Sequence, residues 1–219
     1  MNIAKFIDHT NIRKNATEEE IKKSCQECKK YGFRGLCVNP EWTKTAKEEL
    51  KNSGIKLTTL IDPPMGLSSH EERMKIVQKA KENGSDEIDI VMNIVDIKYE
   101  RYEKILNDLK EICRILPTKV IIGSGYLIDE EIKKASEIVK ESGAICIKTA
   151  TEKDPIDYFE LKEKARHLKI MKDSAQGLLI KASVGIRNLS DAIWMIENGA
   201  DIIGTSSGPK IIENSEKFK

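Results

Sequence analysis

The sequence predicts an α/β fold in which a single domain, residues 1–219, forms a closed (β/α)₈ TIM barrel. Two observations predict it. Polar segments with helical spacing alternate with short apolar segments along the whole chain, and the apolar segments are nearly continuous rather than alternating. Continuous apolar runs are typical of parallel strands that are covered on both sides. A doubly wound open sheet is the alternative fold, but the sequence lacks the glycine-rich turn of a dinucleotide-binding domain.

Eight strands are expected, and together with the helices between them they use the whole chain. In order they cover residues 5–10, 35–39, 56–61, 87–92, 119–124, 145–150, 178–183 and 201–206. Six of the helical segments end near a glycine, which adopts the positive φ of a helix C-cap at little cost. These glycines are Gly32, Gly54, Gly84, Gly143, Gly177 and Gly199. No linker and no second domain are left over.

Helix starts are also recognisable in the sequence. Thr17 with Glu20, and Ser69 with Glu72, have the spacing of capping boxes. Further N-caps are expected at Asp129 and at either Asn188 or Ser190.

The charge balance argues against nucleic-acid and membrane partners. Lys and Arg number 37 and Asp and Glu number 36, so the chain generates no strong field of one sign. The N-terminal segment has no long apolar stretch of the kind found in signal peptides, and no apolar run is long enough to span a bilayer. A cytoplasmic protein is expected.

Five cysteines, an odd number, fit free thiols in a reducing compartment better than a disulfide framework. Cys25 and Cys28 form a CxxC, but a structural metal site needs a second pair. The simpler interpretation places both on one buried helix face with Ile21 and Tyr31. We therefore expect no metal site.

In a barrel of this kind the chemistry lies at the C-terminal ends of the strands. These ends are expected to form a polar ring above an apolar core. The ring comprises Asp8, Thr10, Asn39, Asp62, Asp89, Ser124, Lys148, Lys181 and residues 205–207.

Lys148 and Lys181 stand out because lysine is rarely buried in an apolar strand without a partner. They come from consecutive strands, so their ammonium groups should approach each other at the barrel mouth. A second cation and partial desolvation both disfavour protonation, and moving a lysine pKa from about 10.4 to near 7 needs roughly 4–5 kcal/mol. A neutral amine there would attack aldehydes or ketones. The alternative is structural: one lysine reaches solvent and the other pairs with Asp89.

Asp89 lies inside an apolar strand and could relay protons during carbinolamine and enamine steps, or serve only as a partner for a lysine. After the last strand, Gly204, Ser206 and Ser207 precede a helix that can begin at Pro209. Free N–H donors and hydroxyls at a helix start favour an anion. The loops after the last two strands of such barrels often bind phosphate.

Several motifs in order carry a resemblance that runs nearly from end to end. FIDHT, GFRGLCVNPEW, DEIDIVMN, IKTAT, IKAS followed by GIR, and GADIIGTSSG resemble those of the deoxyribose-phosphate aldolase family. The resemblance implies a class I aldolase with a (β/α)₈ barrel and no metal or organic cofactor. It implies reversible cleavage of 2-deoxyribose 5-phosphate to glyceraldehyde 3-phosphate and acetaldehyde, and a possible homodimer.

The resemblance also implies roles for individual residues. Lys148 matches the Schiff-base lysine, Lys181 the second lysine, and Asp89 the proton-relay aspartate. The positions matching the phosphate site are Thr151, Lys153, Gly185, Gly204, Ser206 and Ser207. Asp8, Thr10 and Cys37 match positions that line the pocket.

Four departures from the family pattern concern the acceptor pocket. Glu152 and Val184 stand where the family has glycine, Gly123 and Ser124 replace a glutamate–threonine pair, and Asp62 and Pro63 replace a glycine and a phenylalanine. A glutamate would repel a phosphate dianion, and valine limits close approach to the backbone. The C-terminal tail also lacks the tyrosine found in some members.

These departures lead to the hypothesis of a working lysine aldolase whose acceptor differs from the usual sugar phosphate. Two further functions remain open. One is another Schiff-base condensation or dehydration in a specialised pathway. The other is a barrel without turnover that binds a small metabolite.

Overall fold

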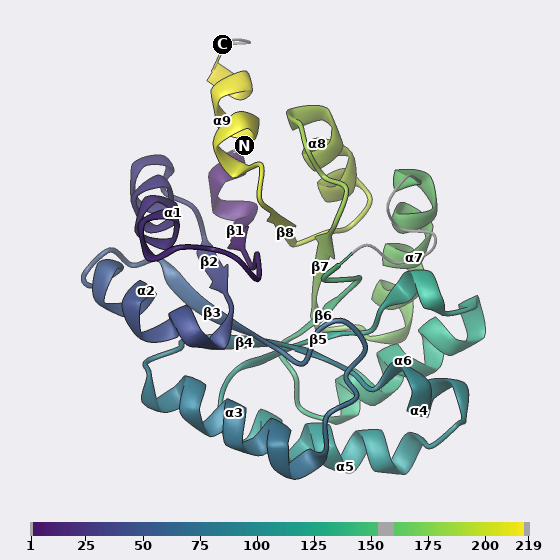
Figure 1. Ribbon diagram of the computed structural model, residues 1–219. Helices are drawn as coiled ribbons and strands as arrows, with labels where there is room; N and C mark the ends of the chain where they lie inside the picture. Colours follow the sequence, from purple (N-terminus) through teal and green to yellow (C-terminus); the bar gives the residue numbers. More distant parts are fainter. Residues whose placement is uncertain (1, 153–159, 217–219) are drawn as a thin grey trace.

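The computed structural model describes residues 2–152 and 160–216, in which eight parallel strands form a closed barrel (Figure 1). The predicted fold class is confirmed. Each strand pairs with its neighbours in chain order, and β8 pairs with β1. The strands are β1 (Ile7–Asn11), β2 (Gly35–Val38), β3 (Lys56–Ile61), β4 (Glu87–Val91), β5 (Thr118–Ile121), β6 (Cys146–Lys148), β7 (Leu179–Ser183) and β8 (Ile202–Thr205).

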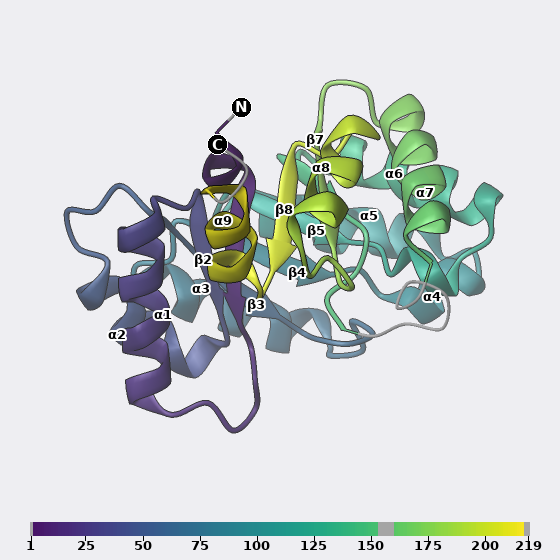
Figure 2. The same ribbon diagram turned by 90° about the horizontal axis from the view of Figure 1, so that it is seen from above.

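Helices surround the barrel, as Figures 1 and 2 show in two views at right angles. The main ones are α1 (Glu18–Tyr31), α2 (Thr43–Glu49), α3 (His70–Glu82), α5 (Tyr102–Cys113), α6 (Asp129–Glu141), α7 (Leu161–Ser174), α8 (Leu189–Glu197) and α9 (Gly208–Glu216). Shorter ones are η1 (Ile3–Phe6), η2 (Pro40–Trp42), α4 (Ile94–Lys98) and η3 (Ser124–Tyr126). None of these described helices has the length and apolar character needed to cross a bilayer.

The helix ends follow the local signals closely. Both predicted capping boxes are present at the starts of α1 and α3, and Asn188 caps α8. The cap expected at Asp129 is wrong. Ile128 occupies the N-cap position with an extended backbone, and its N–H donates to Glu131. Asp129 is instead the first helical residue, where its negative charge interacts favourably with the positive end of the helix dipole.

The glycines expected near helix ends all have positive φ, but they do not all occupy the same position. Gly32 is itself the C-cap of α1, with φ 66°. Gly84, Gly143 and Gly199 each follow a cap formed by another residue. The short sequence signal therefore located the turns correctly and the helix ends to within a few residues.

The apolar core lies between the outer face of the strands and the helices. Ile21, Cys25 and Cys28 are fully buried on one face of α1, which agrees with the packing interpretation of the CxxC. Burial raises the pKa of Cys25 to about 12. The barrel interior is different, because it contains fully buried charged side chains.

The expectation of a polar ring above an apolar core is therefore wrong for three residues. Asp8, Asp89 and Lys181 are fully buried within the barrel instead of standing at its rim. Asp89 and Lys181 each lie two residues before the ends of β4 and β7, at Val91 and Ser183, and Asp8 is the second residue of β1, so the three side chains lie below the rim.

Candidate active site

Seven charged side chains form one connected group inside the barrel, which we call the charge cluster. They come from five strands and from the residue that precedes β2. The members are Asp8, Arg34, Glu87, Asp89, Lys119, Lys148 and Lys181. All but Arg34 have less than 9% of their surface exposed, so the ions interact where water screens them little.

Asp89 is the centre of the charge cluster. Its Oδ2 accepts hydrogen bonds from Lys148 Nζ at 2.7 Å and from Lys181 Nζ at 2.9 Å, while Oδ1 accepts from Lys119 Nζ at 2.9 Å. The two lysines singled out from the sequence thus meet on a single carboxylate oxygen. Both lysines are buried and both pair with Asp89, whereas the structural alternative has one of them reaching solvent.

The other two carboxylates each bind Arg34 and one of the lysines that also contact Asp89. Asp8 Oδ2 lies 2.6 Å from Lys181 Nζ, and Asp8 Oδ1 lies 2.8 Å from Arg34 Nη1. Glu87 lies 2.7 Å from Lys119 Nζ and 3.0 Å from Arg34 Nη2. Every ion in the cluster has at least one opposite charge in hydrogen-bond range, as burial of charge requires.

Burial opposes ionisation throughout the charge cluster, but the ion pairs outweigh it. Burial would raise the pKa of Asp89, yet Lys119, Lys148 and Lys181 hold that pKa well below its usual range. The pKa of Asp8 is likewise lowered, chiefly by Lys181. Burial would lower the pKa of Lys181, but Asp8 and Asp89 raise it. Lys181 is therefore a lasting cation at neutral pH.

The cluster has four basic and three acidic side chains, so it carries one excess positive charge when all are ionised. Loss of a single ammonium proton would make it neutral. Lys119 is also held as a cation, because Asp89 and then Asp8 and Glu87 raise its pKa against the effect of burial. Lys148 is the member that lies at the C-terminal end of its strand, beside the cavity described below.

Two glycines, which have no side chain, provide the space that the charge cluster needs. A Cβ at Gly35 would lie 2.9 Å from Asp8 Oδ1 and 2.8 Å from a backbone oxygen of Lys56. At Gly204 it would lie 2.2 Å from Ser183 Oγ and 3.1 Å from Lys181 Cε. Side chains at these positions would displace the ions or the cavity wall beside them.

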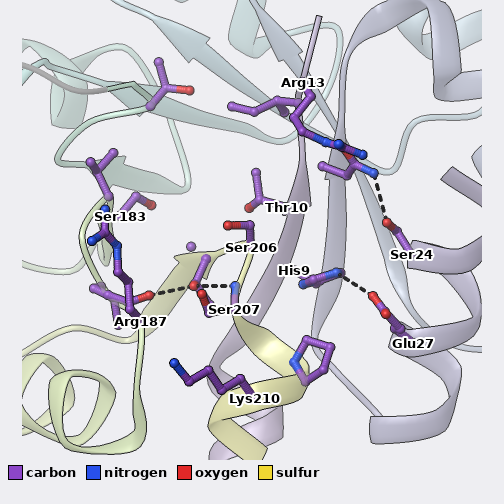
Figure 3. Close-up of a pocket in the computed structure, with 18 of the residues that line it drawn as sticks. His9, Thr10, Arg13, Ser24, Glu27, Ser183, Arg187, Ser206, Ser207 and Lys210 are labelled. Atoms are coloured by element: carbon purple, nitrogen blue, oxygen red, sulfur yellow. Dashed lines mark hydrogen bonds and ion pairs between the residues drawn. The ribbon is translucent and has the colours of Figure 1, made fainter. Parts of the chain in front are cut away.

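A cavity of about 740 Å³ opens above Lys148, the last residue of β6. Its wall contains six of the sequence-predicted binding residues, from the ends of β1, β6, β7 and β8. They are Thr10, Thr151, Gly185, Gly204, Ser206 and Ser207. Figure 3 shows Thr10, Ser183, Arg187 and Ser206 around this space. Lys148 is the cluster lysine in the cavity wall.

The remaining predicted residues fall elsewhere. Asp8, Asp89 and Lys181 lie below the cavity, and Cys37 is buried, which raises the pKa of its thiol to about 11. Lys153 lies outside the described residues. Asp62 accepts hydrogen bonds from Ser68 and pairs with buried Arg73, outside the cavity wall.

The local structure explains why position 123 is a glycine. Its φ is 60°, and a Cβ there would lie 2.9 Å from Ile94 Cδ1. Asp62 and Gly123 thus shape the loops after β3 and β5.

Two hydroxyls in the cavity wall have no protein partner among the described residues. Thr151 Oγ1 and Ser183 Oγ are buried, yet neither makes a hydrogen bond there. Buried polar atoms are nearly always satisfied, so such atoms beside a cavity indicate a place for a polar ligand.

The loops after β7 and β8 are joined to each other at this wall. Thr205 Oγ1 donates to the carbonyl of Ile186 at 2.7 Å and accepts from the N–H of Ser207 at 2.9 Å (Figure 3). This link fixes the start of α9 against the loop that precedes α8. Both loops line the same part of the cavity.

Several residues of the site escaped the sequence analysis. Lys119, Glu87 and Arg34 were not singled out, although a lysine and a glutamate within apolar strands were visible as a signal. Four further basic residues line the cavity from α1, α9 and loops: Arg13, Lys23, Arg187 and Lys210. Isolated surface cations give no sequence signal, because only folding brings them together.

Comparison with known proteins gives a consistent result. A family model described as DeoC/LacD family aldolase matches residues 2–214. A deoxyribose-phosphate aldolase of Caldanaerobacter subterraneus subsp. tengcongensis is 40% identical over 224 residues, covering 99% of this chain and 95% of the relative. One from Mycoplasmopsis pulmonis is 40% identical over 220 residues, covering 99% and 98%.

Solved structures agree. QR15, an aldolase, superimposes with a TM-score of 0.91 at 38% identity, covering 99% of this chain and 97% of the other. The deoxyribose phosphate aldolase of Aeropyrum pernix, which has a tetrameric structure, gives a TM-score of 0.88 at 27% identity over 99% and 92%.

The charge cluster should make stability depend on acid pH. The folded-state pKa values of Asp8, Glu87 and Asp89 lie below their unfolded values, so their stabilisation is complete above about pH 5 and disappears as pH falls through the folded values. Urea titrations from pH 7 to pH 3 should show the free energy of unfolding falling by on the order of 3 kcal/mol. The decline should be shallower in Asp8→Asn. Equal free energies of unfolding at pH 7 and pH 3 would contradict the stabilising role of the charge cluster.

Proposed function

We propose that this chain, which belongs to the DeoC/LacD family of aldolases, is a deoxyribose-phosphate aldolase. It is an aldehyde-lyase that cleaves 2-deoxyribose 5-phosphate to glyceraldehyde 3-phosphate and acetaldehyde, and it catalyses the reverse addition. One observation carries the mechanism. Lys148 lies in the cavity wall while its Nζ contacts a carboxylate that also binds two other buried lysines.

The reaction begins when the neutral Lys148 amine adds to the substrate aldehyde. The resulting carbinolamine loses water to give an iminium ion, which draws electrons from the neighbouring carbon–carbon bond. A base takes the proton of the 3-hydroxyl group as that bond breaks. The electron pair passes to an enamine, and glyceraldehyde 3-phosphate leaves. Protonation of the enamine and hydrolysis then release acetaldehyde and restore the amine.

Asp89 and Lys181 are suited to the proton transfers of this sequence. Asp89 Oδ2 is 2.7 Å from the Lys148 nitrogen and can accept or return a proton there. Lys181 remains positively charged next to the same oxygen, so it stabilises the carboxylate. Asp89 is placed to stabilise the positive charge of the iminium ion that forms on Lys148.

The phosphate group would bind at the loops after β7 and β8. Gly185, Gly204, Ser206 and Ser207 line that side of the cavity, together with the partnerless hydroxyl of Thr151. α9 begins at Gly208 and presents the positive end of its dipole. Basic residues outnumber acidic ones in the cavity wall, which favours a dianion.

Location and assembly follow as further parts of the proposal. All five cysteines are free thiols, which supports a reducing compartment such as the cytoplasm. A homodimer is the assembly we propose. One related aldolase is tetrameric, so light scattering should distinguish one, two and four copies.

Lys148→Met should abolish both cleavage of 2-deoxyribose 5-phosphate and covalent capture of acetaldehyde in the presence of borohydride, because the nucleophile is lost. Mass spectrometry of the wild type should find one ethyl group on Lys148. The exposed Lys162 on α7 provides a control, and Lys162→Met should behave as the wild type. An unmodified wild-type lysine would favour the metabolite-binding alternative, and an adduct without cleavage would favour another Schiff-base reaction.

Glu152 is the observation that favours a different acceptor, because it lines the cavity beside Thr151. Competition between 2-deoxyribose 5-phosphate and 2-deoxyribose tests this hypothesis. We expect kcat/KM to favour the phosphorylated sugar by about a hundredfold or more, since several charge-assisted hydrogen bonds are lost without phosphate. Glu152→Gln should lower KM for the phosphorylated sugar, whereas Glu48→Gln on α2 should not. Comparable rates with both sugars would establish the altered acceptor.

A further inference from the structure

A buried lysine that the reaction does not use lies behind the proposed phosphate site. Lys164 is in the first turn of α7, and none of its surface is exposed. Its Nζ donates to the carbonyl of Ser183 at 2.6 Å and to the carbonyl of Val184 at 2.5 Å. The side chain therefore binds the backbone where β7 ends and the loop to α8 begins.

This loop has an unusual backbone conformation. Val184 has φ 71° and Gly185 has φ 81°. Positive φ is ordinary for glycine but strongly disfavoured for a β-branched residue. Such a conformation persists only where surrounding contacts hold it. The two hydrogen bonds from Lys164 are such contacts, because they bind the carbonyl of Val184 and that of the residue before it.

The direction of these carbonyls determines the direction of the next two N–H groups. In a trans peptide the C=O and the N–H point to opposite sides. The Ser183 carbonyl shares its peptide with the Val184 N–H, and the Val184 carbonyl shares its peptide with the Gly185 N–H. Lys164 holds both carbonyls from the α7 side, while Val184 and Gly185 line the cavity.

We propose that Lys164 is a positioning residue for phosphate recognition: it holds the loop after β7 so that the N–H groups of Val184 and Gly185 face the cavity and donate to the substrate phosphate. The inference rests on the proposed function. A buried ammonium on the carbonyl side also polarises both peptides, which makes these N–H groups stronger donors to an anion. Lys164 thereby supports the valine that replaces a glycine in this loop.

The test separates phosphate binding from the chemical step. In Lys164→Met, KM for 2-deoxyribose 5-phosphate should rise about ten- to hundredfold, as expected when hydrogen bonds to a charged group are weakened, while kcat changes little. The dissociation constant of inorganic phosphate, measured by calorimetry, should rise by a similar factor. Capture of acetaldehyde on Lys148 should remain at the wild-type level, because acetaldehyde has no phosphate. Normal capture also shows that the variant has folded.

Two further variants sharpen the result. Lys169→Met removes the same charge from an exposed position of α7 and should leave all these constants unchanged. Lys164→Met combined with Val184→Gly should recover much of the lost phosphate affinity, because glycine adopts positive φ without the lysine. A double variant as weak as Lys164→Met alone would overturn the positioning role.

Other outcomes also test the positioning role of Lys164. An unchanged KM and phosphate affinity in Lys164→Met would refute the inference, and so would an equal rise in KM for unphosphorylated 2-deoxyribose. If the wild type fails to cleave 2-deoxyribose 5-phosphate, the proposed function fails, but phosphate calorimetry still tests Lys164. A wild type that binds no phosphate would overturn the inference on its own.

Discussion

One constraint governs this barrel: seven charged groups lie together in its largely buried interior, so each must lie beside an opposite charge. Taking ions out of water is costly, and only close hydrogen-bonded pairing offsets that cost. Asp89 meets this requirement for three lysines at once. The strand register then matters greatly, since a shift by one residue would move Asp89 to the outer face and leave the lysines uncompensated.

The same ion pairs also determine the charge balance of the site. With four basic and three acidic groups, the cluster becomes neutral when one lysine is uncharged. Lys119 and Lys181 are held as cations by their carboxylates, whereas Lys148 lies at the end of its strand beside the cavity. The catalytic role that we propose for Lys148 therefore depends on the whole group of buried charges, of which Lys181 is one member.

The proposed phosphate site depends on supporting contacts, some of them made from outside the barrel. The loops after β7 and β8 are tied together through Thr205, and Lys164 grips the first of them from α7. These contacts involve backbone carbonyls, so they orient N–H donors without occupying the cavity. A helix on the outside of the barrel thus holds the backbone of a loop that lines the cavity.

The sequence by itself determined the strand–helix alternation, the barrel, the capping boxes and the lysine at the end of β6, because these depend on local periodicity and on residue types that are rare in apolar strands. It placed Asp8, Asp89 and Lys181 at the rim, because residue type within a strand does not show how far below the mouth of the barrel a side chain lies. The family resemblance supplied roles for residues but not their contacts. Only the tertiary structure brought Lys119, Glu87 and Arg34 to Asp8 and Asp89, and Lys164 to Val184. Such contacts join residues far apart in the chain, and their energies depend on distance and burial, which no local pattern contains.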